Sequence, residues 1–138
     1  MRNRVSMTEA QVEYAADERG WGLAYIRLGS GKSGGLLRVG FEVCRHPALL
    51  EREVSYAALS AVCHVLRARG VRRVAIFVPD AQIVADIGER RELPAALLLP
   101  YVRLRCELNQ FAEHSVAVAG DRELAARARA EVALHVAA

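Results

Sequence analysis

The chain has 138 residues, of which 53% are hydrophobic and 25% are charged, with a net charge of +3 and a pI near 9.0. This length suits one domain with a sizeable core, and the composition excludes a disordered chain. Its apolar runs fall well short of the ~20 residues that cross a bilayer, so no membrane partner is expected. The N-terminus lacks the apolar segment of a secretory signal, and the three cysteines form no CxxC pair. These features predict a cytoplasmic protein.

The first half of the chain has the pattern of three strands. After a flexible arm of residues 1–10, we expect a short strand at Gln11–Ala16 and a second one at Trp21–Leu28. A glycine-rich turn, residues 29–35, leads to Leu36–Cys44, where apolar and polar residues alternate. Two extended segments around such a turn predict a β-hairpin, so the three strands form an antiparallel meander.

The second half alternates helices and strands. Apolar residues recur every three or four positions after Pro47, and Gly70 is placed to end that helix. The later elements are a strand, two helices, a strand and a helix, at Val74–Val78, Ala81–Ile87, Pro94–Phe111, His114–Ala119 and Asp121–Val136. This order predicts a single α/β domain over residues 11–138, with a mixed sheet of five strands and helices on both faces.

Several segments of this order resemble bacterial type 1 ribonuclease H. Val12–Asp17 is similar to the family's first strand, which ends in a catalytic Asp, and Gly20–Gly22 is similar to the start of its second strand. The other matching positions are Val54–Leu59, Val78–Val84, Tyr101, Arg105, Leu108 and Phe111. The resemblance implies a ribonuclease H-like fold and an activity in which metal ions cleave the RNA strand of an RNA/DNA hybrid.

The resemblance also implies a site of four carboxylates around two divalent ions, Mg²⁺ or Mn²⁺, because hard ions need converging oxygen ligands. Asp17 and Asp80 match the first and third positions and are the expected catalytic residues and metal ligands. The second position falls on Ser55, and the best register of the fourth puts Arg127 there. Neither side chain can replace a carboxylate. The weaker substitutes are Glu51, Asp121 and Glu123.

The incomplete set favours an inactive relative, a nucleic-acid-binding protein of the ribonuclease H type whose hydrolysis is weak or lost. Asp17 can equally be a solvated turn residue, and Asp80 can be a helix N-cap. The alternative function is a non-catalytic scaffold or protein-interaction module that keeps the fold. For the apolar segment Leu97–Leu99, a homodimer contact and a buried helix both stay open.

Arginines dominate the basic residues, because Lys32 is the only lysine among nineteen Lys and Arg residues. The candidate phosphate contacts are Arg19, Arg72, Arg73 and Arg90. For Arg72 and Arg73, attraction to the end of the preceding helix is the alternative. Gly31–Ser33 invites comparison with a phosphate-binding loop, but the glycine required five residues earlier is Ile26. The segment also lies in a predicted hairpin, so no nucleotide cofactor is expected.

Overall fold

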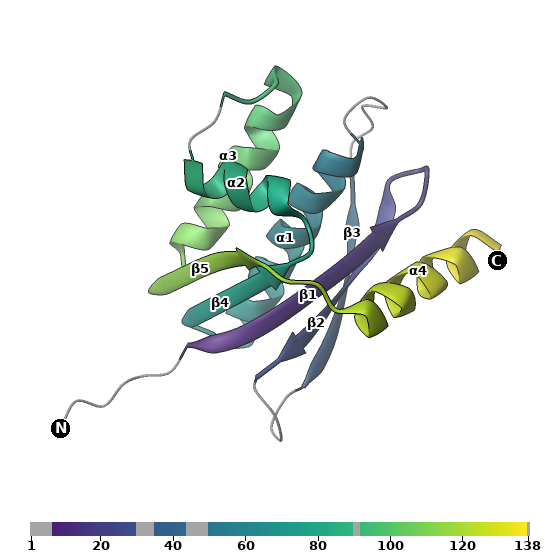
Figure 1. Cartoon of the computed structure of the whole chain (residues 1–138), viewed down its shortest axis with the longest axis horizontal. Helices are drawn as coiled ribbons and strands as arrows, with labels where there is room; N and C mark the ends of the chain where they lie inside the picture. The colour runs from purple at the N-terminus through teal and green to yellow at the C-terminus, as the bar shows by residue number, and fades with distance from the viewer. Residues whose placement is uncertain (1–6, 30–34, 44–49, 90–91, 138) are drawn as a thin grey trace.

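The structure is a computed structural model that describes residues 7–29, 35–43, 50–89 and 92–137. Its strands are β1 (Thr8–Ala16), β2 (Trp21–Leu28), β3 (Leu36–Glu42), β4 (Arg73–Val78) and β5 (Glu113–Val118). Its helices are α1 (Leu50–Ala68), α2 (Ala81–Glu89), α3 (Ala95–Asn109) and α4 (Arg122–Ala137). The order confirms the predicted sequence of strands and helices, with ends shifted by a few residues (Figure 1).

The five strands form one mixed sheet in the order β3-β2-β1-β4-β5. The pairs β1–β2 and β2–β3 are antiparallel, which confirms the predicted meander. The pairs β1–β4 and β4–β5 are parallel. Parallel pairing brings the C-terminal ends of β1, β4 and β5 to one edge of the sheet, where side chains from distant segments can meet.

The expected N-terminal arm is too long at its inner end. Thr8, Glu9 and Ala10 belong to β1 and lie beside Val74, Ala75 and Ile76 of β4. The sequence hides this start because Thr and Glu carry no apolar signal, and the strand is held there by its parallel partner. Residues 1–6 lie outside the described part of the chain.

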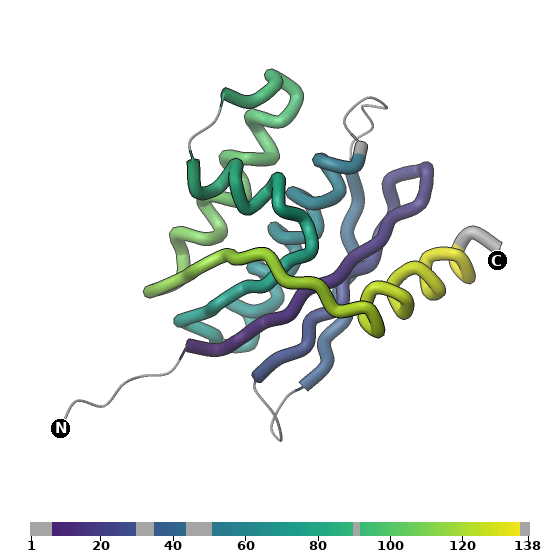
Figure 2. Tube along the Cα trace, viewed as in Figure 1, coloured from purple at the N-terminus to yellow at the C-terminus, as the bar shows by residue number. Residues whose placement is uncertain are grey.

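Helices cover both faces of the sheet, as predicted. Side chains alternate along β1, so Val12 enters the main core under α1 while Ala15 packs against the smaller core under α4. In β2, Ile26 and Tyr25 divide in the same way. Figure 1 shows the connection from β5 to α4 crossing in front of β1, while α1 passes behind the sheet, and the Cα trace in Figure 2 follows the same path. None of the described helices is long and apolar enough to span a membrane.

The glycines around Trp21 are required by the β1–β2 hairpin. Gly20 has φ +87°, and a Cβ atom there would lie 2.5 Å from the carbonyl oxygen of Val43. A Cβ on Gly22 would lie 2.3 Å from Cζ of Phe41. The Gly-Trp-Gly segment therefore lets the chain turn tightly and lets β3 approach β2.

A buried ion pair fixes α2 against α1. Asp86 is 2% exposed, and its Oδ2 accepts hydrogen bonds from Arg52 Nη2 at 2.6 Å and from the Tyr56 hydroxyl at 2.8 Å. The Tyr56 ring also meets Tyr101 of α3 edge to face, with centroids 6.4 Å apart. The Asp86 carboxylate thus joins α2 to α1, and the Tyr56 ring extends the contact to α3. Removal of this carboxylate would leave Arg52 without its counter-charge.

We predict that Asp86→Ala lowers the free energy of unfolding by about 3 kcal/mol, because the largely buried side chains of Arg52 and Tyr56 lose their shared partner. The matched control is Glu113→Ala, which removes the carboxylate of the solvent-exposed pair with Arg73 and is expected to cost less than about 1 kcal/mol. Urea denaturation of the two variants checks the difference. Equal losses would show that the buried pair has no special role.

Candidate functional site

A shallow cleft of about 450 Å³ lies at the C-terminal end of β4, where β1, α1 and α2 converge. Its lining includes Tyr14, Asp17, Glu51, Arg52, Ser55 and Asp80, and we call it the Asp80 cleft. Three sequence-predicted carboxylates, Asp17, Glu51 and Asp80, therefore border one cavity, together with the serine at the second position. The topology brings them to the edge that the resemblance implies.

A short chain of hydrogen bonds crosses this cleft. The Ser55 hydroxyl donates to Asp80 Oδ2 at 2.8 Å, and the Tyr14 hydroxyl lies 2.6 Å from Ser55 Oγ. A serine hydroxyl has one proton, and an ionised carboxylate only accepts, so Tyr14 donates to Ser55. Strand β1, helix α1 and the end of β4 are joined through two neutral hydroxyls and one carboxylate.

The Tyr14 hydroxyl keeps its proton at neutral pH. Burial raises its pKa to about 12, and the negative charges of Asp80 and Glu13 act in the same direction. The hydrogen bond with Ser55 opposes this shift but is the smaller effect. Tyr14 therefore acts in the cleft as a donor and supplies no negative charge.

Asp80 has its second oxygen engaged in local structure. Its Oδ1 accepts the backbone N–H of Gln82 at 2.9 Å, which makes it the N-cap of α2. The capping role considered from the sequence is thus present. Because the other oxygen accepts from Ser55, both oxygens of this carboxylate already have partners within the protein.

Asp17 follows the last residue of β1 and organises the hairpin turn. Its Oδ1 accepts the backbone N–H groups of Arg19 at 2.8 Å and Trp21 at 3.0 Å. Such a bond from an Asp side chain to the backbone two residues on is typical of a tight turn. Asp17 borders the Asp80 cleft, but its Oδ1 is committed to the turn.

The residues present do not fit a two-ion centre. Two divalent ions need several carboxylates converging on shared positions. In the described part of the chain, no group of three His, Cys, Asp or Glu side chains is arranged to hold a metal ion. The β1 residue that meets Ser55 is Tyr14, and Ser55 itself donates to Asp80. Within the described residues, the carboxylates of the cleft therefore do not converge as a two-ion centre requires, and one Asp80 oxygen is occupied by Ser55.

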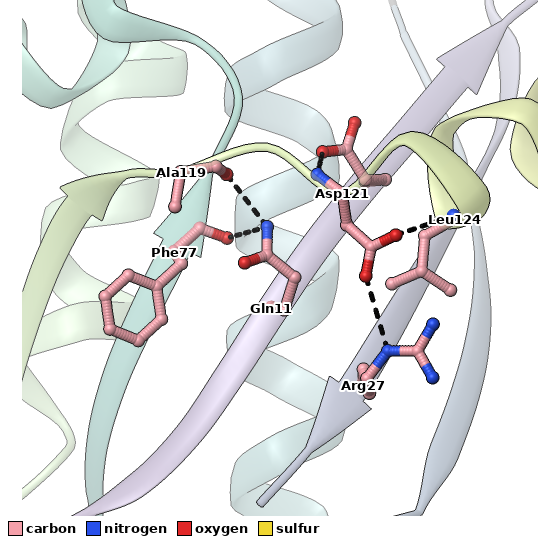
Figure 3. Close-up of polar contacts among 7 residues, drawn as sticks. Gln11, Arg27, Phe77, Ala119, Asp121 and Leu124 are labelled. Atoms are coloured by element: carbon pink, nitrogen blue, oxygen red, sulfur yellow. Dashed lines mark hydrogen bonds and ion pairs between the residues drawn. The ribbon is translucent and has the colours of Figure 1, made fainter. Parts of the chain in front are cut away.

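The remaining carboxylate candidates lie on α4, away from the Asp80 cleft. Asp121 caps α4 by accepting from Leu124 N at 3.1 Å and pairs with Arg27 Nε at 3.3 Å (Figure 3). Its own N–H donates to Glu13, which faces α4 from β1. Burial raises the pKa of Glu13, with the nearby Asp121 adding to the effect and the N–H bond and Arg129 opposing it. Glu123 is exposed in the first turn of α4.

Arg127 also lies outside the cleft, with its guanidinium over the Tyr25 ring at 5.3 Å from the centroid. Figure 3 shows that the connection to α4 is fastened to the sheet by Gln11, whose side-chain amide donates to the carbonyl of Ala119 at 2.8 Å. This anchorage sets where α4 begins. It places the fourth expected position on the face opposite α1.

The predicted phosphate contacts are spread over the molecule. Arg19 lies in the hairpin turn beside Asp17. Arg72 and Arg73 lie at the N-terminal end of β4, with Arg73 paired to Glu113 at 3.4 Å. The length of β4 separates them from Asp80 by roughly 23 Å, at ~3.3 Å per residue. Arg90 and the Gly31–Ser33 segment lie outside the described residues.

Sequence reasoning missed Tyr14, although a signal for it exists. Strand residues two apart face the same side, so Tyr14 shares a face with Val12, which lies in the main core under α1. Asp17 lies just beyond the strand, so the hairpin turn and not the alternation of faces places its side chain. Counting faces from Val12 points to Tyr14 as the residue opposite Ser55.

Comparison with solved structures gives a clear answer for the fold. Ribonuclease H1 from the archaeon Halobacterium salinarum matches with a TM-score of 0.68 at 19% identity, covering 94% of this chain and 99% of that one. The chain has the ribonuclease H-like fold. The N-terminal ribonuclease H domain of a Mycobacterium tuberculosis protein matches with a TM-score of 0.67 at 15% identity, covering 94% and 98%.

A ribonuclease H1 isolated from compost, solved with an RNA/DNA hybrid, matches this chain with a TM-score of 0.61 at 12% identity, covering 89% and 91%. Comparisons with protein-family models and with curated proteins give no match. At identities this low, the likeness to ribonuclease H structures establishes the fold alone, and the site must be judged by its own residues.

We predict that the Tyr14 hydroxyl stabilises the fold only below its own pKa. A folded pKa near 12, against about 10 in the unfolded chain, means that this contribution is complete below pH 10 and is lost as pH rises toward 12. Wild type should exceed Tyr14→Phe in stability by about 1 kcal/mol at pH 8. Between pH 8 and pH 11.5, the stability of wild type relative to Tyr14→Phe should fall by about 2 kcal/mol.

Urea unfolding of both proteins at the two pH values measures this difference. Subtracting the variant removes the titration of the other tyrosines, including Tyr56, whose pKa is also raised by burial. A constant difference between the two proteins from pH 8 to pH 11.5 would contradict the buried hydrogen-bonded hydroxyl.

Proposed function

We propose that this chain binds RNA or an RNA/DNA hybrid as a ribonuclease H-like protein whose metal-dependent hydrolysis is weak or lost. The observation that carries the proposal is the Tyr14–Ser55–Asp80 hydrogen-bond chain. It places the neutral hydroxyl of Ser55 on α1 where the resemblance implies a carboxylate, and it occupies one oxygen of Asp80. In this chain, hydrogen bonds among the protein's own side chains cross the cleft.

The charge distribution supports binding outside this cleft. Without ions, the negative charges of Asp80 and Glu51 repel a phosphate, so we expect phosphate contacts from arginines outside the cleft. Arg19 stands at the hairpin, and Arg72 is exposed at the opposite end of β4. One guanidinium group can bind two phosphate oxygens through two parallel N–H bonds. The predominance of arginine, eighteen of nineteen Lys and Arg residues, therefore favours a phosphate-containing partner.

The fold neighbour solved with an RNA/DNA hybrid gives the ligand class its rationale. The RNA/DNA hybrid is the ligand of that neighbour, and we propose the same class of ligand for this chain. Mg²⁺ and Mn²⁺ are the ions to test, because they are the ones that the resemblance implies. The cleft's residues do not favour either.

A scaffold function is the second candidate, and the outer surface of α3 favours it. Leu97 is buried, but Leu98, Leu99 and Val102 are 51%, 63% and 51% exposed. An apolar patch of this kind can mark a protein-interaction surface. Under this alternative the chain binds a protein through α3, as a homodimer or with another partner, and shows no affinity for nucleic acid.

We predict salt-dependent binding without cleavage for an RNA/DNA hybrid. Fluorescence anisotropy with a labelled 18-base-pair hybrid at 50–200 mM salt measures binding, and a denaturing gel with Mg²⁺ or Mn²⁺ measures cleavage. The expected result is an affinity that falls with salt and an intact RNA strand. Strong cleavage that Asp80→Asn abolishes would overturn the lost hydrolysis, and failure to bind hybrid or RNA would favour the scaffold.

We predict that Arg72→Ala weakens hybrid binding and lowers the slope of log K against log salt by about 1, as the loss of one phosphate contact requires. The matched control is Arg38→Ala, which removes an exposed arginine already paired with Glu131 at 3.5 Å. The control should leave the slope unchanged. Equal slopes for the two variants would remove Arg72 from the interface.

A further inference from the structure

A second cavity in the described part of the chain is larger than the Asp80 cleft. It measures about 1000 Å³ and lies between the β1–β2 hairpin and the C-terminal half of α4. Its lining includes Asp17, Glu18, Arg19, Trp21, Arg129 and His135, and we call it the Trp21 groove. This volume is at the upper end of the range for small-molecule sites, which bury most of a bound ligand.

Two aromatic rings are stacked in this groove. Trp21 opens β2, on the same face as Tyr25, and its ring lies parallel to that of His135 near the end of α4. The ring centroids are 3.6 Å apart, with an angle of 14° between the planes. His135 is exposed and Trp21 is partly buried, so solvent reaches the stacked pair. Planar aromatic surfaces of this kind hold nucleic-acid bases by stacking.

Cationic groups reach the groove from both sides. Arg129 is exposed on α4 and forms no ion pair with another described residue, although its charge acts on the carboxyl of Glu13. Arg19 reaches it from the hairpin. A guanidinium group binds a phosphate through two parallel N–H bonds. The carboxylates of Asp17 and Glu18 in the same lining are acceptors for hydroxyl groups.

We propose that the Trp21 groove binds one unpaired nucleotide at the end of a nucleic-acid strand. The base stacks on the Trp21–His135 pair, and the phosphate contacts Arg129 and Arg19. The inference rests on the proposed function for its ligand class. It adds a location next to the Asp80 cleft, because Asp17 borders both cavities.

The protein carries its own reporter for this site, because Trp21 is the only tryptophan in the chain. A base that stacks on the pair changes the emission of Trp21, excited at 295 nm where nucleotides absorb little. Four probes distinguish a free nucleotide, a single strand, a paired end and an unpaired end. They are AMP, a six-nucleotide RNA, a blunt hybrid, and that hybrid with a three-nucleotide 3′ RNA overhang. We predict a saturable change with the RNA and the overhang, and a much weaker one with AMP and the blunt hybrid.

The variants keep Trp21 in place. Arg129→Ala and His135→Ala should each weaken binding of the six-nucleotide RNA by about tenfold, the loss expected for one stacked base or phosphate contact. Arg122→Ala is the matched control, since Arg122 is also an exposed arginine of α4 but lies two turns before Arg129. It should change the affinity by less than about twofold.

Failure of this proposal is distinguishable from failure of the proposed function. The absence of any saturable change in Trp21 emission, or equal effects of Arg129→Ala and Arg122→Ala, overturns the groove while hybrid binding measured by anisotropy stands. Equal affinity for AMP and the RNA would show that the groove binds a free nucleotide and not the end of a strand. Equal response to the blunt and overhanging hybrids would contradict the claim that the bound nucleotide is unpaired.

Discussion

The hydrogen bond from Ser55 to Asp80 is the contact on which the character of this site depends. It connects α1 to Asp80, which follows β4 and caps α2. The Ser55 hydroxyl also accepts a hydrogen bond from Tyr14 of β1. Three elements that are distant in sequence are thereby fixed at the C-terminal edge of the sheet. A carboxylate at Ser55 would bring a second negative charge close to Asp80, where like charges repel unless a cation separates them.

The hairpin between β1 and β2 shapes the neighbouring surface in a similar way. Asp17 binds two backbone N–H groups of the turn, and Gly20 allows the positive φ that a short reversal needs. Trp21 is thereby held under the end of α4, where His135 stacks on it. The same short turn that commits Asp17 to the backbone also opens the larger of the two cavities on this side of the molecule.

The strands and helices could be predicted from the sequence because their apolar periods are distinct and their ends carry turn residues. The sequence also predicted that Ser55, and not a carboxylate, stands at the second position that the resemblance implies. The role of Tyr14 required the alternation of faces in β1 to be counted from the core. The start of α4 could be predicted from its capping residue Asp121, but the face of the sheet that α4 covers could not. That placement depends on contacts such as Gln11 with Ala119 and Glu13 with Asp121, each 108 residues apart in sequence.

The differences between expectation and structure have the same origin. Thr8 and Glu9 are strand residues because β4 pairs with them, not because of their own propensities. Arg127 covers Tyr25 because α4 packs on the outer face of β1 and β2. Local patterns therefore determined the elements of this chain, while long-range hydrogen bonds determined which side chains meet.

The central claim of the proposed function is that Ser55, standing where the resemblance implies a carboxylate, leaves this cleft without a metal site. Titration of the protein with Mn²⁺, followed by isothermal calorimetry, tests it most directly when wild type is compared with Ser55→Glu. The expected result is no saturable heat at millimolar Mn²⁺ for wild type, and measurable binding once a second carboxylate is introduced beside Asp80. Saturable Mn²⁺ binding by wild type that Asp80→Asn removes would contradict the claim.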